Sequence, residues 1–305
     1  MTFLKNYFLL IEKDIFNFQF SIVLKTYLIY DGVLFSSDAL LLRTTNRAFR
    51  FGDGLFETMH YHKGNILFFD DHYERLLRGM SIMRFSLKGL LPKNVLHERI
   101  ISLVVKNRLF GDARIRLTLF RKESGVLTSE SFQASCIIET FPIDEQSYIL
   151  NDKGYIVDVF SEFPKIVSPL SPFRTISSDA YTLGWLYAKE NRLDDCLIVN
   201  NSGKITESSN SNLFWIKGET VYTPKIASGC IDGVFRKQLL LILLKLNFKV
   251  VETEGATIDE ISNAEELFLT NSIDGIRWVV GFKNKRFYNF KIKEIFREFK
   301  KTIGD

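Results

Sequence analysis

The alternation of apolar and polar residues predicts both strands and helices in the first half of the chain. TYLIYDG and VLFSS form a predicted hairpin around Asp31-Gly32, and GLFETMHYHKGNILFF alternates like two strands joined at Lys63-Gly64. Apolar residues then recur at helical spacing in HYERLLRGMSIMRF and in NVLHERIISLVVKNRL, which follows Pro92. ARIRLTLFRK and QASCIIETF are predicted to be the strands that close this half.

The second half has a different order of predicted elements. A strand, YIVDVF, precedes a Ser/Pro-rich loop and a helix near 178–191, and three or four short strands are predicted between 195 and 224. The pattern then predicts a helix in DGVFRKQLLLILLKL, a strand in FKVVET, a short helix, a strand in ELFLTN and a C-terminal helix. Mixed strands and helices in both halves indicate an α+β fold with two domains, 26–145 and 152–305, divided by a polar stretch near 142–153.

Composition narrows the class of protein. The chain is 46% hydrophobic and 25% charged, which is typical of a soluble globular protein. The net charge is only +4 and the basic residues are dispersed, so we expect neither a nucleic-acid partner nor a membrane surface. Residues 1–25 form an extension of unknown role, whose apolar runs of about five residues are too short for a signal peptide or a membrane span.

The cysteines and histidines carry no recognisable metal or disulfide pattern. Cys136, Cys196 and Cys230 lack such spacing, which favours buried thiols in a reducing cytoplasm. His60 and His62 would share one face of a strand, but the sequence offers no third ligand beside them. We therefore expect no metal site.

The stretch ITESSNSNLFWIKGETVYTPKIASGCIDGVFRKQ, residues 205–238, contains most of the candidate chemistry. Glu207 is followed by small polar residues and by Asn212, which enters an apolar strand, and a second strand ends at Thr223-Pro224. A loop then opens a helix at Gly233, and the free N–H groups of a helix N-terminus bind phosphate. Taken alone, these features also fit a meander followed by a capped helix.

As a whole, this stretch resembles the signature of the class IV aminotransferases, the fold-type IV family of pyridoxal-phosphate enzymes. The matching elements are Glu207-x-Ser209-x-x-Asn212-Leu213-Phe214, Val221-x-Thr223 and Ile231-x-Gly233-Val234-x-Arg236. RAFRFGDGLFETMHYHKGNILFFDDHYERL, residues 47–76, is similar to the family's N-terminal block, and ELFLTNSIDGI to its late strand and turn. The resemblance, from about Tyr27 to Val280, implies the two-domain fold of D-amino acid aminotransferase-like proteins, a cofactor between the domains and a homodimer.

The resemblance also implies a site for pyridoxal 5'-phosphate and roles for individual residues. Arg75 would hold the cofactor phosphate, a task that suits its fixed charge and fork geometry. Glu207 would face the pyridine nitrogen and keep it protonated. Because an unpaired buried carboxylate is costly, we also expect a partner cation for Glu207. The other residues that the resemblance places at the cofactor are Asn212, Gly233, Val234, Thr270 and Asn271.

One position departs from the family pattern. Aligned on the helix YTLGWLYAKENRLDDCLIVN, Arg174-Thr175 occupies the place of a Lys-Thr or Lys-Ser pair, whose lysine binds the cofactor as a Schiff base. Arginine cannot replace that lysine, because its guanidinium stays protonated and is not a primary amine. Ser177 also stands where many relatives have Asn. Lys165 and Lys225 could substitute for the lysine, and under a different alignment Arg174 would be a solvated residue before a helix.

Three functions are compatible with these residues. The first is a pyridoxal-phosphate enzyme of the aminotransferase or aminodeoxychorismate-lyase type, acting on an amino or keto acid or a chorismate-derived substrate. The second is a non-catalytic relative that binds pyridoxal phosphate non-covalently, or another small phosphorylated ligand. The third is an enzyme with altered chemistry in which Arg174 binds an anionic group. Family ancestry favours the first as a description of what the protein is, whereas loss of the lysine favours the second or third as a description of what it now does.

Overall fold

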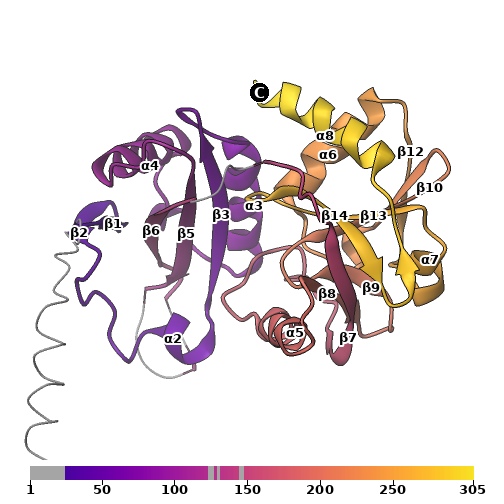
Figure 1. Cartoon of the computed structure of the whole chain (residues 1–305). Coiled ribbons are helices and arrows are strands. Elements are labelled where there is room, and N and C mark those ends of the chain that lie inside the picture. The colour runs from indigo at the N-terminus through magenta and orange to yellow at the C-terminus, as the bar shows by residue number, and fades with distance from the viewer. Residues whose placement is uncertain (1–24, 123–126, 129–130, 144–147) are drawn as a thin grey trace, which may run out of the picture.

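The computed structural model describes residues 25–122, 127–128, 131–143 and 148–305. They fold around two sheets that lie side by side, the first formed by the indigo and magenta part of the chain and the second by the part that runs to yellow (Figure 1). The predicted extension, residues 1–25, lies outside the described part except for Lys25, as does the centre of the predicted polar boundary. The two sheets nevertheless divide the chain on either side of that boundary.

The first sheet has six strands in the order β2-β1-β6-β5-β3-β4 and is antiparallel at every pairing. Its elements along the chain are β1 (Tyr27–Tyr30), β2 (Val33–Ser36), α2 (Arg47–Phe51), β3 (Gly54–His62), β4 (Asn65–Ile66), α3 (Phe69–Ile82), the 3-10 turn η1 (Leu87–Gly89), α4 (Lys93–Lys106), β5 (Ala113–Arg121) and β6 (Ala134–Pro142). The predicted hairpins, the two helices and the closing strands are confirmed, whereas α2 was not predicted.

The second sheet has nine strands and is partly closed. Its elements are β7 (Tyr155–Lys165), α5 (Asp179–Glu190), β8 (Asp195–Asn200), β9 (Ile205–Ser208), β10 (Asn212–Lys217), β11 (Thr220–Pro224), η2 (Ile226–Ser228), α6 (Val234–Lys245), β12 (Lys249–Thr253), α7 (Ile258–Ser262), β13 (Glu266–Asn271), β14 (Gly275–Phe282), β15 (Lys285–Arg286) and α8 (Phe290–Thr302). Strand β9 pairs with both β8 and β10, so the strands β10-β13-β14-β7-β8-β9 form a ring. The fold is therefore a two-domain α+β fold with a barrel-like second sheet.

Apolar periodicity accounts for the packing of each half. One core lies between β3, β5 and β6 and the apolar faces of α3 and α4, with Met80 and Ile100 fully buried. A second lies between the barrel and helices α6 and α8, where the Phe214 and Phe268 rings stack at 5.1 Å. Figure 1 shows α3 on the side of the first sheet that faces the second half. Helix α3 thus carries side chains toward the junction of the domains.

Strand β7 differs from its prediction in a way that affects the site. The pattern predicts a strand that ends at Phe160, but β7 continues to Lys165, which pairs with Asn200 of β8 after an irregularity in the register. The alternation of side chains is lost along this extension, because residues 161–164 are all exposed. The extension brings the Lys165 side chain to the interior of the second domain, at 11% exposure.

No helix among the described residues is long and apolar enough to cross a membrane.

Candidate cofactor and active site

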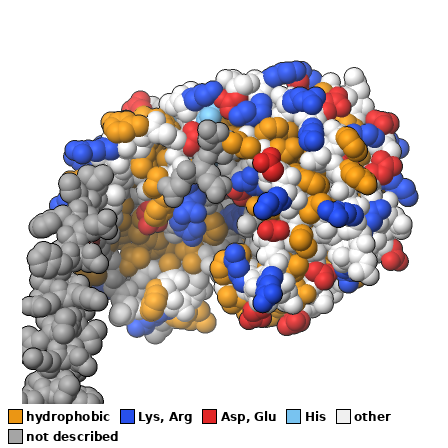
Figure 2. Space-filling view, viewed as in Figure 1, with side chains coloured by type: hydrophobic (Ala, Val, Ile, Leu, Met, Phe, Trp, Pro, Cys, Tyr) orange, Lys and Arg blue, Asp and Glu red, His pale blue; other side chains and the backbone are white. Residues whose placement is uncertain are grey.

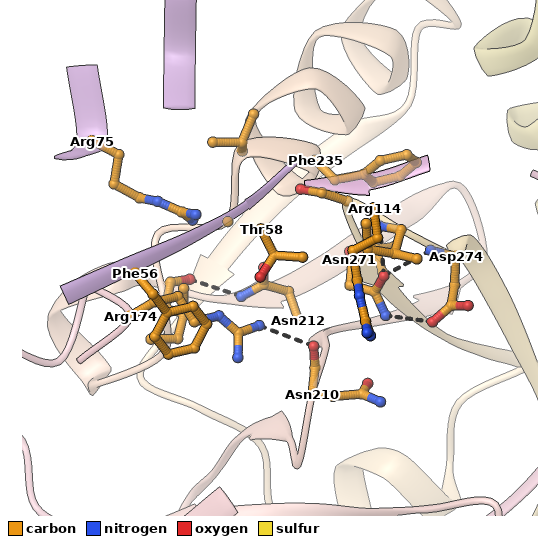
Figure 3. Close-up of a pocket in the computed structure, with 16 residues that line it drawn as sticks. Phe56, Thr58, Arg75, Arg114, Arg174, Asn210, Asn212, Phe235, Asn271 and Asp274 are labelled. Atoms are coloured by element: carbon orange, nitrogen blue, oxygen red, sulfur yellow. Dashed lines mark hydrogen bonds between the residues drawn. The ribbon is translucent and has the colours of Figure 1, made fainter. Parts of the chain in front are cut away.

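A cavity of about 340 Å³ lies where the two sheets meet (Figure 3). Its walls come from β3, α3 and β5 of the first domain and from the loop before α5, the β9–β10 turn, the start of α6 and the β13–β14 turn of the second. Figure 2 shows Lys and Arg side chains in the recess between the two halves. The residues predicted at the cofactor that line this cavity are Arg75, Asn212, Gly233, Val234, Thr270 and Asn271. Arg174 lines it as well, and Glu207 does not.

Arg75 is held rigidly on α3 by a buried carboxylate. Its Nε and Nη2 atoms donate to the two oxygens of Glu57 at 2.8 and 2.6 Å, and Nη1 donates to the carbonyl of Asp232 at 2.8 Å. His72 Nδ1 contacts the same carboxylate at 2.7 Å. Burial alone would raise the pKa of Glu57, but the Arg75 charge and these hydrogen bonds lower it to about 2. Three of the five N–H groups of the guanidinium are used, which leaves two for a ligand.

The start of α6 forms a second group of donors. Gly233 is the N-cap of α6 and no side chain caps the helix, so its first N–H groups are free to bind an anion. A Cβ at Gly233 would lie 1.9 Å from Asn212 Oδ1, so only glycine permits this close approach. Asn212 itself donates to the carbonyl of Ile231 at 2.8 Å and thereby fixes the loop ahead of the helix.

The β13–β14 turn provides a third wall. Thr270 is 1% exposed, and its hydroxyl has no hydrogen-bond partner among the described residues. A buried polar atom without a partner is unusual, and a ligand in the adjoining cavity would supply one. The Asn271 side chain is already engaged, because its amide contacts Ser211 and Asp274 and its oxygen accepts two backbone N–H groups of the turn. Asn271 therefore shapes the turn rather than offering a free side-chain donor.

Glu207 is buried behind the cavity wall and already has a cation. Its Oε1 atom accepts from Lys165 Nζ at 2.6 Å and from the Tyr181 hydroxyl at 2.8 Å, and Oε2 accepts from the Ile231 N–H at 2.9 Å. Burial, and then the Glu207 charge, raise the pKa of Tyr181 well above its ordinary value, so this phenol stays protonated. The predicted partner cation is thus confirmed, and it is Lys165.

Arg174 is fixed by its own backbone at the edge of the first sheet. The Phe56 N–H donates to the Arg174 carbonyl at 2.8 Å, the Ile176 N–H donates to the Gly54 carbonyl at 3.0 Å, and Leu55 forms an isolated bridge with Thr175. The guanidinium points into the cavity, where Nη2 donates to the Asn210 carbonyl at 3.0 Å (Figure 3). No carboxylate of the described residues lies within 4.0 Å of it.

No lysine lines the cavity among the described residues. Lys165, one of the two predicted substitutes, faces a separate cavity of about 140 Å³ and is bound to Glu207. Lys225, the other, forms an ion pair with Glu254 on the surface. Neither amine is placed to react with a ligand beside Arg174.

The cavity also has an arginine that the sequence analysis did not single out. Arg114 on β5 lines it, with its guanidinium 5.0 Å from the centre of the Phe141 ring. Its neighbour Arg116 stacks over Phe56 at 4.0 Å. Burial lowers the pKa of Arg116 and Glu139 opposes this, while the charges of Arg114 and Arg174 lower it further. Positive charge therefore gathers on this side of the cavity, which a strand-like pattern such as ARIRLTLFR does not reveal.

Comparison with known proteins agrees with the fold and with the residue pattern. Residues 54–282 match the family model for amino-transferase class IV, and the chain belongs to this family. The aminodeoxychorismate lyase of Bacillus subtilis is 25% identical over 76% of this chain and 78% of its own length.

Solved structures of branched-chain aminotransferases share the fold. That of Thermoproteus uzoniensis, described with norvaline, superposes with a TM-score of 0.83 at 19% identity and covers 92% of this chain and 95% of its own. The T.th. enzyme described with pyridoxamine 5'-phosphate gives a TM-score of 0.77 at 19% identity, with 90% of this chain and 93% of its own covered. One of these structures is thus described with a pyridoxal-type cofactor, and both aminotransferases and a lyase are among the relatives of this chain.

Proposed function

We propose that this chain binds a phosphorylated ligand of the pyridoxal type without a covalent link, and that it does not catalyse conventional transamination or lyase chemistry. The observation that carries the proposal is the arrangement at the junction of the domains: the donors expected for a phosphate line one cavity, and Arg174, which the family resemblance aligns with the reactive lysine, lines the same cavity. Lys165, one of the two predicted substitutes, forms an ion pair with Glu207.

The phosphate half of the cavity fits such a ligand. The two free N–H groups of Arg75, the N–H groups at the start of α6 and the unpartnered Thr270 hydroxyl would hold a phosphate. Gly233 keeps the approach to the helix open. When bound, pyridoxal phosphate supplies an aldehyde and an electron-withdrawing ring.

The reactive half does not fit a covalent cofactor. Forming a link to the aldehyde requires a neutral primary amine, and a guanidinium stays protonated and is not a primary amine. Glu207, the residue predicted at the pyridine nitrogen, has both oxygens engaged by the protein itself. Arg174 instead offers fixed positive charge and N–H donors.

We infer that Arg174 binds an anionic group on the ligand. Arg174 and Arg114 line one side of the cavity, and neither has a carboxylate within 4.0 Å among the described residues. Carboxylates match the guanidinium fork, and the amino, keto or chorismate-derived acids expected from the family resemblance carry them. The phosphorylated ligand would therefore bind with its phosphate at the Arg75 end, and a carboxylate of the same or a second ligand would lie at the Arg174 end.

The test is titration of the purified full chain with pyridoxal phosphate, followed by borohydride reduction and mass spectrometry. We expect saturable binding that inorganic phosphate displaces, an unchanged absorption band of the cofactor, and no adduct mass. A reduced adduct on a peptide that contains Lys165 or Lys225 would refute the proposal. So would the absence of any binding.

Two substitutions at one position sharpen the test. Arg174→Lys restores an amine at a backbone position that the first sheet fixes, and we expect it to yield an adduct after borohydride treatment. Arg174→Gln removes the charge without adding an amine, so it should bind pyridoxal phosphate without an adduct and bind simple carboxylates more weakly than the native chain. If Arg174→Lys gives no adduct, residue 174 is not at the position of the family lysine.

We also propose that the protein is a homodimer, as the resemblance implies. Apolar side chains are exposed along the segment between β2 and α2 and on α2 itself, with Leu40 fully exposed and Phe49 at 77%. They border an open groove of about 540 Å³ with Leu28 and Ile137. Association of two copies would cover this surface, and light scattering of the purified chain measures it directly.

A further inference from the structure

A cluster of histidine and aspartate side chains lies at the opposite end of β3 from Gly54, separate from the phosphate site. His60 and His62 share one face of β3, and Asp112 immediately precedes β5, whose first residue Ala113 pairs with Tyr61. The cluster therefore contains the third ligand that sequence spacing could not provide.

The ligand atoms in this cluster are close together. His60 Nε2 lies 3.2 Å from one oxygen of Asp112, and His62 Nδ1 lies 2.8 and 3.0 Å from its two oxygens. One atom from each of the three residues lies within 4.8 Å of the others. The His60 ring is 1% exposed and the His62 ring 9%.

Each imidazole has oxygen acceptors at both of its nitrogens. His60 Nδ1 contacts the carbonyl oxygen of Ile273 at 3.1 Å, and His62 Nε2 contacts a carboxylate oxygen of Asp305 at 3.1 Å. Each of the four ring nitrogens therefore contacts an oxygen atom. A neutral imidazole carries only one N–H, so two of these contacts would set one lone pair against another.

Two arrangements remove the conflict: both histidines are protonated, or a divalent cation lies between the rings and Asp112. Burial disfavours two adjacent imidazolium ions, because the His60 and His62 side chains are only 1% and 9% exposed. Asp305 forms ion pairs with Lys63 and Lys300, so its negative charge is already balanced. Asp112 is therefore the carboxylate of this group beside which a cation is needed. The Tyr148 ring, stacked on His60 at 4.4 Å, supplies no charge.

We propose that His60 Nε2, His62 Nδ1 and the Asp112 carboxylate bind a divalent transition metal of the zinc type. Imidazole and carboxylate ligands suit Zn²⁺ and the metals that substitute for it. Bonds of about 2.0–2.1 Å arranged as a tetrahedron hold ligand atoms roughly 3.3 Å apart, close to the 2.8–3.2 Å that separates each imidazole nitrogen from the Asp112 oxygens. A water would complete the set.

The outer nitrogens of the two rings support this assignment. With the metal on His60 Nε2 and His62 Nδ1, the remaining N–H groups donate to the Ile273 carbonyl and to Asp305. Histidine ligands of metals usually donate their second N–H to a carbonyl or a carboxylate, which fixes the tautomer and orients the ring. Every nitrogen then has one compatible partner.

The site would join three parts of the chain. His60, His62 and Asp112 belong to the first domain, Ile273 lies in the β13–β14 turn that lines the phosphate cavity, and Asp305 follows α8. A bound ion would therefore stabilise the junction of the domains. It does not depend on whether the cavity binds pyridoxal phosphate.

The experiment uses the full chain, freed of metal with a chelator and then dialysed. We expect titration with Zn²⁺ to show one tightly bound equivalent by calorimetry and elemental analysis, and Zn²⁺ to raise the thermal midpoint. Co²⁺ should give the visible absorption of a four-coordinate site. Asp112→Asn and His62→Gln should abolish the tight equivalent, while His97→Gln, a histidine on α4 outside the cluster, should retain it.

A graded variant separates a metal site from general destabilisation. Asp305→Asn leaves all three ligands in place and should keep one equivalent with affinity reduced by roughly 10–100-fold. Circular dichroism of each variant checks that it is folded. Zinc binding that is equal in the His97 and His62 variants would overturn the proposal. So would a native chain whose stability neither zinc nor chelator changes. If that chain also loses stability as the pH rises through the histidine range, the cluster holds two imidazolium ions instead of a metal.

Discussion

Glu57→Gln removes the negative charge from the centre of the buried group that positions Arg75 in the proposed phosphate site. The native carboxylate binds two nitrogens of Arg75 and contacts His72, and its side chain is 3% exposed. Burial lowers the pKa of His72, which disfavours a second positive charge beside Arg75, and an imidazole cannot supply the lost negative charge. The substitution keeps the shape of the side chain but leaves a buried guanidinium without a counter-ion.

The pKa of Glu57 sets the size of the effect. Its value falls from 4.5 in a model peptide to about 2 in the fold. At about 1.4 kcal/mol per pH unit, this corresponds to roughly 3 kcal/mol of stability at neutral pH. Breaking a buried ion pair by removing one partner costs about 3–5 kcal/mol, which agrees. Because the folded pKa is the lower one, the contribution is fully present above about pH 4.5 and is lost as the pH falls toward 2.

Urea unfolding followed by circular dichroism measures this difference. At pH 7 we expect the Glu57→Gln midpoint to fall by an amount equivalent to roughly 3 kcal/mol, and the gap from the native chain to narrow below pH 4.5. Glu98→Gln, an exposed residue on α4 of the same domain, is the matched control and should change little. Equal midpoints for native and Glu57→Gln chains at pH 7, or a gap that does not change with pH, would refute the reasoning.

Three further predictions concern the same cavity and the buried thiols. Thr270→Val removes a buried hydroxyl that has no partner, so the unliganded protein should be as stable as the native one, while calorimetry should show affinity for pyridoxal phosphate reduced by about 2–10-fold. Gly233→Ala places a Cβ against Asn212 and should lower stability by about 1–3 kcal/mol and abolish phosphate binding, as thermal unfolding and titration would show. Burial raises the pKa of all three cysteines to about 12, so below that pH the thiols are protonated, and a thiol reagent at pH 8 should label them only after denaturation.

Local pattern was enough to predict most elements, whereas the residues expected at the cavity were named from the family resemblance. Helical spacing predicted α3, which carries Arg75 near its middle, and α6, whose N-cap is Gly233. The strands that carry Asn212 and Thr270 were predicted for the same reason. Each of these elements has a clear apolar face, so a residue's place on it can be inferred from spacing alone.

Contacts between distant segments could not be inferred in this way. Lys165 reaches Glu207 only because β7 continues five residues beyond its apolar pattern and pairs with β8. Asp112 meets His62 through the register of β5 against β3, which no local signal fixes. The partners of these residues are set by sheet pairing, so they lie outside what a pattern along one segment determines.

The main-chain bonds that hold residues 174–176 against β3 have a consequence for redesign. They involve only backbone atoms, so the direction in which side chain 174 projects does not depend on which residue is there. A substitution at position 174 can therefore change the reactive group in the cavity without removing the hydrogen bonds that hold this segment. The protein is accordingly a host in which amines of different length, or non-natural nucleophiles, can be installed at one site and compared without rebuilding the surrounding fold.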